Sequence, residues 1–168
     1  HSSYVASEFA KKFGAKNMHF DPINQNIQQN TLKRIFDLDR LPHFDIENSH
    51  TILSFGADWL STWHSPAQYN EMYGAFREGK GGERGYFIHV DPRMSNTAAS
   101  SDLWLSPIPG TEGDLALGIA HEIITSKLVD EKFINQYLSV VDINLDEYST
   151  SIVANKCDIS EEKIKEAA

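Results

Sequence analysis

The stretch Tyr86-Phe87-Ile88-His89-Val90-Asp91-Pro92-Arg93 indicates how the chain folds. Its first five residues form a short, largely apolar run, which is typical of a strand buried inside a sheet. The polar turn that follows opens with an Asp-Pro pair, and turn-forming residues of this kind end a strand. The pattern therefore predicts a strand over residues 86–90 whose carboxyl end carries Asp91 and Arg93.

Two further strands are predicted, one on each side of this stretch in the sequence. The run Thr51–Phe55 stops at a glycine, and Leu103–Leu105 forms a shorter apolar run. Helical patterns alternate with the strands, one opening at Ser65-Pro66 and the longest covering Thr111–Leu128. Such alternation favours parallel pairing through right-handed crossovers. We therefore expect residues 1–168 to form a single three-layer α/β domain with a mainly parallel sheet.

Shorter patterns predict the remaining secondary structure. They indicate helices near residues 4–13, 27–36, 131–138, 145–155 and 160–168, a short strand near 17–20, and loops over 37–50 and 79–85. Thr111 is placed to cap the amide of Asp114 in the longest helix, and Ser160 is placed to cap the last helix.

Composition restricts the classes of function. Of the 168 residues, 40% are hydrophobic and 11% aromatic, which is typical of a folded domain. A formal net charge of −9 argues against a nucleic-acid partner and against docking on an anionic membrane, because no cationic surplus exists. The single Cys157 excludes an internal disulfide and any multi-cysteine metal site. The ragged ends lead us to expect a fragment of a larger protein.

The loops after the predicted strands are the places where a parallel α/β sheet binds ligands. Asp91 can accept two hydrogen bonds from a guanine edge or from a ribose, and Arg93 offers a planar fork for a phosphate or a face for a base. Gly110 permits close backbone approach, and the amides of residues 111–113 at a helix start can bind an anion. Together these residues suggest a nucleotide site.

Plainer interpretations stay open for the same residues. Asp91-Pro92-Arg93 can also be a turn with a local ion pair, and the segment before the longest helix can also be an ordinary loop and helix cap. Spacing alone favours these plainer interpretations over a nucleotide site. His121-Glu122 lacks the second histidine of a zinc protease, because residue 125 is threonine. No catalytic or metal-ligating residue is assigned. The tryptophans at 59, 63 and 104 are expected to pack under the loops.

Several segments, in order along the chain, resemble the dimethyl sulfoxide reductase family of molybdopterin oxidoreductases. They are Val90-Asp91-Pro92-Arg93, Thr97-Ala98, Ser101-Asp102 and Pro109-Gly110-Thr111-Glu112, followed by the helix from Asp114-Leu115. The resemblance covers roughly residues 51–168. The loop Ser54–Leu60 is similar to large subunits of membrane quinone-linked respiratory complexes, of the polysulfide-reductase-like kind.

This resemblance implies a Rossmann-like domain of the formate dehydrogenase and dimethyl sulfoxide reductase type. Such a domain grips one molybdopterin guanine dinucleotide, with molybdenum or tungsten, while an iron–sulfur cluster lies outside this fragment. The implied partners are the rest of the parent subunit, an iron–sulfur electron-transfer subunit and a membrane anchor subunit, with the periplasmic face of a membrane as the implied location. The parent would be an oxidoreductase, whereas the fragment alone would be inactive.

Carried over residue by residue, the resemblance implies a set of cofactor-binding positions. Asp91 and Arg93 would hold the nucleotide end, Gly56 would meet the phosphates, and the base and ribose would be lined by Gly110, Thr111 and Glu112.

Three positions depart from the family's pattern. Asp58, a further predicted cofactor-binding residue in the Gly56 loop, replaces the usual Asn; Ile108 replaces an Arg, and Glu112 replaces an Asp. A carboxylate such as Asp58 is unfavourable beside a pyrophosphate. The alternative hypothesis is therefore a structural domain of a respiratory complex that has lost the cofactor.

Overall fold

The computed structural model describes residues 2–18, 26–40, 42–79, 81–134, 136 and 144–168. These residues divide into two compact units, residues 1–44 and residues 45–168. The expectation that residues 1–168 act as a single domain of a larger subunit stays a prediction.

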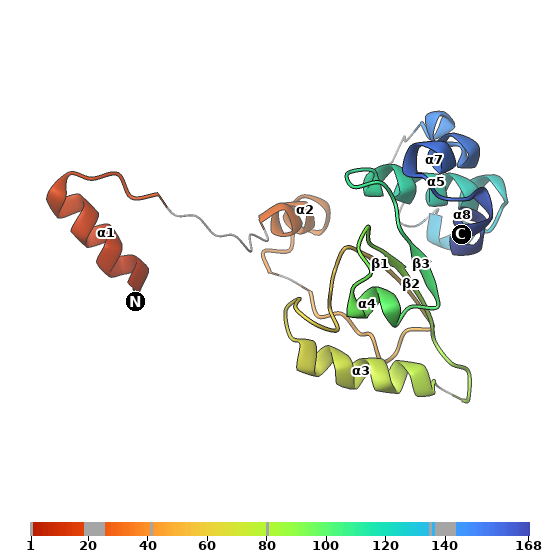
Figure 1. The fold of residues 1–168 in the computed structure, drawn as a ribbon, viewed down its shortest axis with the longest axis horizontal. Coiled ribbons are helices and arrows are strands. Elements are labelled where there is room, and N and C mark those ends of the chain that lie inside the picture. The colour runs from red at the N-terminus through yellow and green to blue at the C-terminus, as the bar shows by residue number, and fades with distance from the viewer. Residues whose placement is uncertain (1, 19–25, 41, 80, 135, 137–143) are drawn as a thin grey trace. The chain divides into compact units, whose positions relative to one another are not determined.

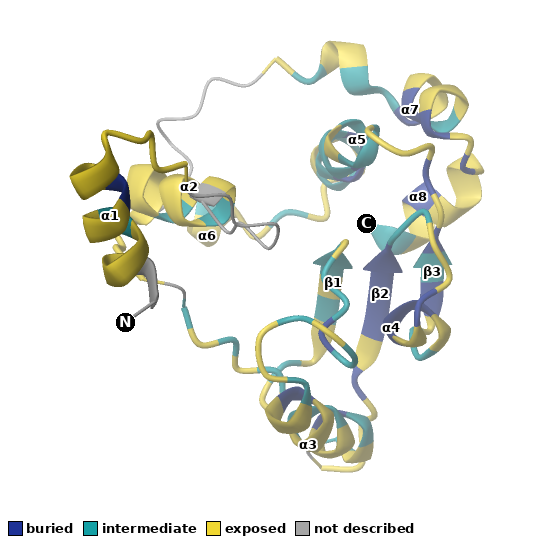
Figure 2. Ribbon diagram, turned by 60° about the vertical axis from the view of Figure 1, so that its left-hand side comes forward, coloured by how far each residue is buried: buried dark blue, intermediate teal, exposed yellow. Residues whose placement is uncertain are grey.

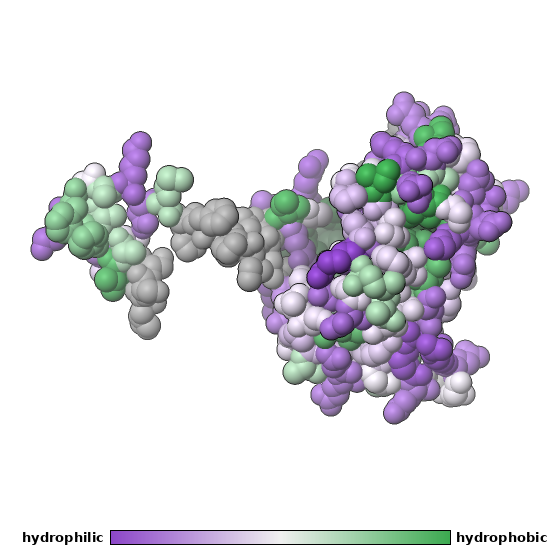
Figure 3. All heavy atoms as spheres, viewed as in Figure 1, coloured by the Kyte–Doolittle hydropathy of each residue, from purple (hydrophilic) through white to green (hydrophobic). Residues whose placement is uncertain are grey.

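The first unit holds two of the predicted helices, α1 (Ser2–Phe13) and α2 (Asn26–Phe36). Helix α1 ends at Gly14, whose φ of +66° favours glycine because a side chain would be strained there. Helix α1 carries four exposed large hydrophobic side chains: Tyr4, Val5, Phe9 and Phe13. Figure 3 shows green, hydrophobic spheres over this helix. The strand expected near residues 17–20 is not formed by residues 17 and 18, and residues 19 and 20 lie outside the described residues.

The second unit contains the sheet and its covering helices (Figure 1). In chain order its elements are β1 (Thr51–Phe55), α3 (Pro66–Glu78), β2 (Tyr86–Val90), α4 (Asn96–Ala99), β3 (Leu103–Leu105), α5 (Glu112–Thr125), α6 (Glu131–Phe133), the 3₁₀ helix η2 (Asp146–Tyr148), α7 (Thr150–Cys157) and α8 (Glu161–Ala167).

The three strands form a parallel sheet in the order β1-β2-β3. Thr51 lies opposite Tyr86, and Ile88 lies opposite Leu103. All three strands have the predicted bounds, so the prediction of an α/β fold with a parallel sheet is confirmed. Figure 2 shows their arrowheads along one edge, with the central β2 coloured almost entirely as buried.

Helices cover both faces of this sheet. On one face Ile88 and Val90 join a buried apolar cluster with residues of α5, α7 and α8, among them Leu115, Val153 and Ile164. On the other face Phe87 packs against Trp59, with ring centroids 5.1 Å apart, and against Tyr73 of α3. Alternate residues of β2 thus point into two different cores, which is the predicted three-layer arrangement.

A charged cluster ties α3 to the sheet. Arg77 donates to the Asp102 carboxylate and to the carbonyl oxygens of Gly85 and Ser100, and Asp102 also accepts the Phe87 amide. Burial alone would raise the pKa of the Asp102 carboxyl, but the hydrogen bonds from Arg77 and Phe87 and the charge of Arg77 outweigh it, so this pKa is lowered. The cluster fixes the start of β3 relative to β2 and α3.

Some details differ from the prediction. The longest helix ends at Thr125 and not at Leu128, because Lys127 adopts a left-handed φ of +54°. The region 145–155 is not one helix: η2 ends at Tyr148 and α7 begins after Ser149. Of the helix expected over 131–138, α6 accounts for the first three residues, and residues 135, 137 and 138 lie outside the described residues.

We expect Gly118 to set how closely α5 approaches α7. A Cβ at this buried position would lie 2.8 Å from Val153 Cγ1. Gly118→Val should therefore lower the free energy of unfolding by about 2 kcal/mol through overpacking. Urea unfolding followed by circular dichroism measures this.

Gly113→Val provides the matched control, because a Cβ at Gly113 in the same helix has no atom within 4 Å. The double variant Gly118→Val/Val153→Ala should lose less stability than the sum of its two single variants, since the smaller side chain makes room. Equal losses for Gly118→Val and Gly113→Val would contradict the close approach.

Candidate functional site

The loops at the carboxyl edge of the sheet gather most of the predicted site residues. The backbone N–H of Gly56, just after β1, donates to the Val90 carbonyl oxygen at 2.8 Å, and the N–H of Asp91 donates to the Leu105 carbonyl oxygen at 3.1 Å. These two bonds continue the sheet one residue beyond the strands. They hold the loops after β1 and β2 beside one another.

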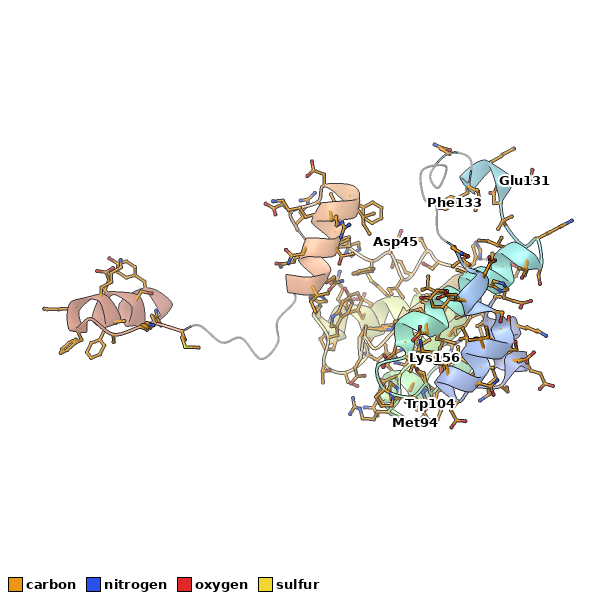
Figure 4. The ribbon with its side chains drawn as sticks, turned by 90° about the horizontal axis from the view of Figure 1, so that it is seen from above. Asp45, Met94, Trp104, Glu131, Phe133 and Lys156 are labelled. Carbon is orange, nitrogen blue, oxygen red and sulfur yellow. The ribbon has the colours of Figure 1, made fainter. Side chains whose placement is uncertain are left out.

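Asp91 is held from several sides. Its Oδ1 accepts the Arg93 backbone N–H at 2.9 Å, which closes a tight turn across Pro92. Its carbonyl oxygen accepts the indole N–H of Trp104 at 2.8 Å. Trp104 is labelled in Figure 4 and comes from β3. The Asp91 side chain is 13% exposed, so it forms a fixed hydrogen-bond acceptor at the edge.

Asp58 is the centre of a second set of contacts. Its Oδ1 accepts the hydroxyl of Thr97 at 2.6 Å, and the same Thr97 oxygen accepts the Leu60 backbone N–H at 3.1 Å. Thr97 is fully buried in α4, so this bond joins the loop after β1 to the short helix after β2. Asp58 is therefore part of the framework of the edge as well as a charge upon it.

Arg93 faces Asp58 and not empty solvent. Its guanidinium nitrogen lies 3.5 Å from Asp58 Oδ2, while its side chain is 72% exposed and that of Asp58 is 13% exposed. Because the guanidinium lies in solvent and the two charged groups are 3.5 Å apart, a pair of this kind is weak, worth about 1 kcal/mol or less. Arg93 can therefore leave Asp58 for an anionic ligand at small cost.

Short helix α4 was not predicted from the sequence, and Thr97 was named only as part of a segment that resembles the family. A local signal exists, because the Ser95 hydroxyl accepts the Ala98 N–H at 3.1 Å and so caps α4. The partner of Thr97 lies 39 positions earlier in the chain. No local pattern shows a contact of that separation.

The segment before α5 was predicted to bring Gly110, Thr111 and Glu112 to the same site. Gly110 has a φ of +91° and a Cβ there would meet no atom within 4 Å, as is also true of Gly56 at φ +62°. Both glycines thus combine a conformation that favours glycine with open space beside them. The Gly110 N–H is taken, since it donates to Glu112 Oε2 at 2.9 Å.

The predicted cap by Thr111 is wrong. Its hydroxyl donates backward to the Ile108 carbonyl oxygen at 2.7 Å, and it makes no capping bond to the helix. The segment is anchored instead by α7, where the Cys157 carbonyl oxygen accepts the Ile108 N–H and the Cys157 thiol donates to the Thr111 carbonyl oxygen at 3.5 Å. The hydrogen bonds of this segment thus run to itself and to α7. Its approach to Asp91 stays a prediction.

Another buried polar side chain, His89, lies beneath Asp91. His89 is fully buried on β2, and its Nε2 lies 3.6 Å from Asp91 Oδ2. Burial lowers the pKa of the His89 imidazole, and the carboxylates of Asp91 and Asp58 act in the opposite direction without offsetting it. The imidazole is therefore neutral at pH 7. The sequence analysis gave His89 no role.

Aromatic side chains support this edge. Trp59 is 2% exposed and contacts the rings of Tyr69, Tyr73 and Phe87. Trp104 bonds the Asp91 carbonyl oxygen as described above. The prediction that these tryptophans pack under the loops is confirmed for Trp59.

The edge is rich in hydrogen-bond acceptors. Asp58 and Asp91 bring carboxylates to the loops after β1 and β2, Glu112 brings one to the start of α5, and Arg93 is the guanidinium among these site residues. Such a surface suits the N–H and O–H groups of a base or ribose.

Among the described residues, no group of three or more His, Cys, Asp or Glu is arranged to hold a metal ion. No helix among them is long and apolar enough to cross a bilayer.

Comparison with known proteins identifies the family. The family described as molybdopterin oxidoreductase matches residues 1–154. The chain belongs to this family. The resemblance to dimethyl sulfoxide reductases noted from the motifs is thereby confirmed.

Three curated relatives cover about half of the chain. The menaquinone reductase molybdopterin-binding-like subunit of Nitratidesulfovibrio vulgaris is 36% identical over 81 residues, which are 48% of this chain and 12% of that protein. The arsenate respiratory reductase molybdopterin-containing subunit ArrA of Chrysiogenes arsenatis is 34% identical over 95 residues, 56% of this chain and 10% of that protein. Dimethyl sulfoxide reductase DmsA of Escherichia coli is 35% identical over 94 residues, 55% of this chain and 11% of that protein.

A solved structure also matches most of this chain. Acetylene hydratase from Pelobacter acetylenicus matches with a TM-score of 0.61 and 26% identity, over 73% of this chain and 16% of the hydratase chain. The chain thus spans about a tenth to a sixth of the length of each of these four proteins.

We expect the Thr97 hydroxyl to stabilise the edge. Thr97→Val keeps the shape of the side chain but leaves the Leu60 N–H and one Asp58 oxygen without their partner. The free energy of unfolding should fall by about 2 kcal/mol. Urea unfolding measures the change, and Thr97→Ser, which keeps the hydroxyl, serves as the control. Equal stability of the two variants would show that the link between the loops is unimportant.

The lowered pKa of His89 predicts an acid-sensitive contribution to stability. Below about pH 6.5 the unfolded chain takes up a proton on this imidazole, whereas the folded chain does so only at lower pH. Stability should therefore fall as the pH drops through 6.5 toward the folded pKa. His89→Gln, which does not titrate, should lose less stability between pH 8 and pH 5 in urea unfolding. Parallel losses in the two proteins would contradict a buried neutral imidazole.

Proposed function

We propose that residues 45–168 hold the nucleotide end of a molybdopterin guanine dinucleotide within a larger oxidoreductase subunit. The observation that carries this proposal is the fixed Asp91 carboxylate, which lies at the carboxyl edge of a parallel sheet in the loop next to that of Gly56. Ligands of open α/β sheets bind at this edge. Family membership makes a molybdopterin cofactor the natural candidate.

The residues at the edge fit the nucleoside part of such a cofactor. The free lone pairs of Asp91 can accept from a guanine edge or from ribose hydroxyls. Gly56 and Gly110 leave open space where a ligand can approach the backbone closely. The Thr111 and Glu112 segment at the start of α5 would line the base and ribose.

The phosphates require a change of partner. Arg93 is the cation that would meet them, and it now faces Asp58 at 3.5 Å. Because this pair is exposed and weak, a phosphate can compete for the guanidinium. Asp58 would then be left beside the phosphates, held in place by Thr97.

The cofactor would supply the two-electron chemistry at its metal, molybdenum or tungsten. The chain's own residues would bind and orient one end of it, which is the general part that proteins play with redox cofactors. In the parent, electrons would pass between the substrate and an iron–sulfur chain. We propose an iron–sulfur subunit and a membrane anchor as partners, on the periplasmic side of a membrane.

A second candidate function is a structural domain without cofactor in a quinone-linked complex. Two contacts favour it: Asp58 occupies Arg93, and Glu112 occupies the Gly110 amide. In each contact a carboxylate takes the place at which a phosphate would otherwise bind. The relative from Nitratidesulfovibrio vulgaris is itself described as molybdopterin-binding-like.

Elemental and pterin analysis of the natively purified parent subunit separates the two candidates. Molybdenum or tungsten, together with guanine released on hydrolysis, would support the cofactor-binding function. Absence of metal and pterin from a natively folded parent would support the structural role.

Binding of guanosine monophosphate to the 168-residue chain tests the role of Asp91 directly. Asp91→Asn should weaken binding about tenfold or more, because one carboxylate oxygen is replaced by a donor and the negative charge is lost. Isothermal titration calorimetry measures this, and Asp114→Asn on α5 is the matched control for loss of one charge. Cytidine monophosphate distinguishes recognition of the guanine edge from recognition of the ribose. Unchanged binding in Asp91→Asn would exclude Asp91 from the site.

Replacing Asp58 should act in the opposite direction. Asp58→Asn keeps an oxygen for the Thr97 hydroxyl but releases Arg93 and removes a carboxylate next to the phosphate. Guanosine monophosphate should therefore bind about threefold to tenfold more tightly. The same titration with guanosine, which has no phosphate, is the control and should change little. Weaker binding of the monophosphate would show that Asp58 itself contacts the ligand.

A further inference from the structure

His89 is a buried polar side chain whose hydrogen-bonding capacity is unused. It is fully buried, and neither ring nitrogen has a hydrogen-bond partner within the part of the chain that the structure describes. A buried donor or acceptor without a partner costs about 1–3 kcal/mol. A leucine or phenylalanine would avoid this cost in the middle of an apolar strand. The imidazole therefore calls for an explanation beyond packing.

The ring is directed toward the candidate site. Asp91 directly follows β2, and its N–H donates to the Leu105 carbonyl oxygen, so the sheet continues to it. His89 and Asp91 stand two positions apart, and their side chains project on the same face. His89 Nε2 lies 3.6 Å from Asp91 Oδ2, a little beyond the usual hydrogen-bond range of about 2.7–3.2 Å. On its other side the ring of Phe87 lies with its centroid 5.7 Å away.

Two carboxylates face the imidazole. Asp91 comes from the end of its own strand, and Asp58 comes from the loop after β1. Asp58 is already held by Thr97 and faces Arg93. Within the described part of the chain, the Asp91 carboxylate accepts one hydrogen bond, from the Arg93 amide to Oδ1, and Oδ2 is turned toward His89. Of the two, Asp91 is therefore the carboxylate that can respond to the imidazole.

A small rotation of the Asp91 carboxylate would close the gap. With its proton on Nε2, a neutral imidazole is a hydrogen-bond donor for Oδ2. The bond would fix the plane of the carboxylate from below. The remaining lone pairs of both oxygens would then point outward at the edge of the sheet.

We propose that His89 is a positioning residue for Asp91: its Nε2–H holds Oδ2 and fixes the plane in which the carboxylate receives a nucleoside. This inference rests on the proposed function, in which Asp91 accepts hydrogen bonds from the nucleotide. His89 touches no ligand itself. It acts only through Asp91.

The inference predicts a dependence on pH that a packing role lacks. A protonated imidazole would form an ionic hydrogen bond with Asp91 and draw negative charge from the side that the ligand contacts. Binding of guanosine monophosphate should therefore weaken as the pH falls and His89 becomes protonated, which burial shifts to a pH below the usual value for an imidazole. An uncharged donor in its place would hold the carboxylate without this effect.

Calorimetric titration of the 168-residue chain with guanosine monophosphate at pH 7 and pH 5 tests this in three proteins. We expect wild type to bind more weakly at pH 5 than at pH 7. His89→Gln, whose amide N–H replaces Nε2–H, should bind within about threefold of wild type at pH 7 and lose less affinity at pH 5. His89→Leu should bind about tenfold more weakly at pH 7, as expected for one lost hydrogen bond.

A measurement without ligand tests the same geometry. The ¹⁵N chemical shifts of the His89 ring at pH 7 identify the protonated nitrogen, and the inference requires it to be Nε2. A proton on Nδ1 would overturn the proposal. Because this measurement uses the wild-type chain, it tests the hydrogen bond from His89 to Asp91 even if circular dichroism shows that His89→Leu is unfolded.

The outcomes separate the two proposals. If wild type binds guanosine monophosphate and His89→Leu binds it equally well, the positioning role is overturned and the proposed function stands. If wild type binds no guanosine monophosphate, the nucleotide-holding function fails, and the positioning role fails with it because no ligand remains to be positioned.

Discussion

Burial of strand β2 on both faces is the constraint on which the rest of the domain depends. Ile88 and Val90 point into the apolar cluster under α5, α7 and α8, while Phe87 points toward Trp59 and α3. Two cores thus meet across five residues, and a shift of one residue would exchange their contents. The position of the end of β2 is fixed as a result, and the position of Asp91, the next residue, is fixed with it. The candidate site is precise because the strand beneath it has no freedom to slide.

The chemistry of the edge follows from how its carboxylates are satisfied. Asp58 is bound by Thr97, Glu112 is bound by the Gly110 amide, and Asp91 keeps free lone pairs. The first two use up groups that would otherwise attract an anion, whereas the third is available to a ligand that donates hydrogen bonds. The edge as it stands therefore favours a nucleoside over a phosphate. The two candidate functions therefore depend on different parts of the same edge. The cofactor-binding function depends on the free lone pairs of Asp91, and the structural function depends on the carboxylates of Asp58 and Glu112.

Sequence patterns predicted the sheet well because its strands are short apolar runs that end in turn residues, and such signals are local. Asp91 and its turn were predicted for the same reason. The contacts that give Asp58 its role could not be predicted, because Thr97 is 39 positions away and its helix has only four residues. The Thr111 cap was wrong because the hydroxyl turns back and donates to the Ile108 carbonyl oxygen, and it does not accept an N–H of the helix.

Arg93 shows why the choice between cofactor binding and a structural role depends on energy differences and not on the fold. The same backbone is compatible with both functions, because neither function requires Asp91, Thr97 or the glycines to change conformation. What differs is the partner of one exposed guanidinium, now a carboxylate 3.5 Å away. A pair worth about 1 kcal/mol or less cannot by itself exclude the pyrophosphate of a dinucleotide, since phosphate can bind Arg through two stronger, bidentate bonds. The weakness of the Asp58 contact is therefore the feature that would allow this domain to bind a nucleotide, as proposed above, although its loops are already rich in negative charge.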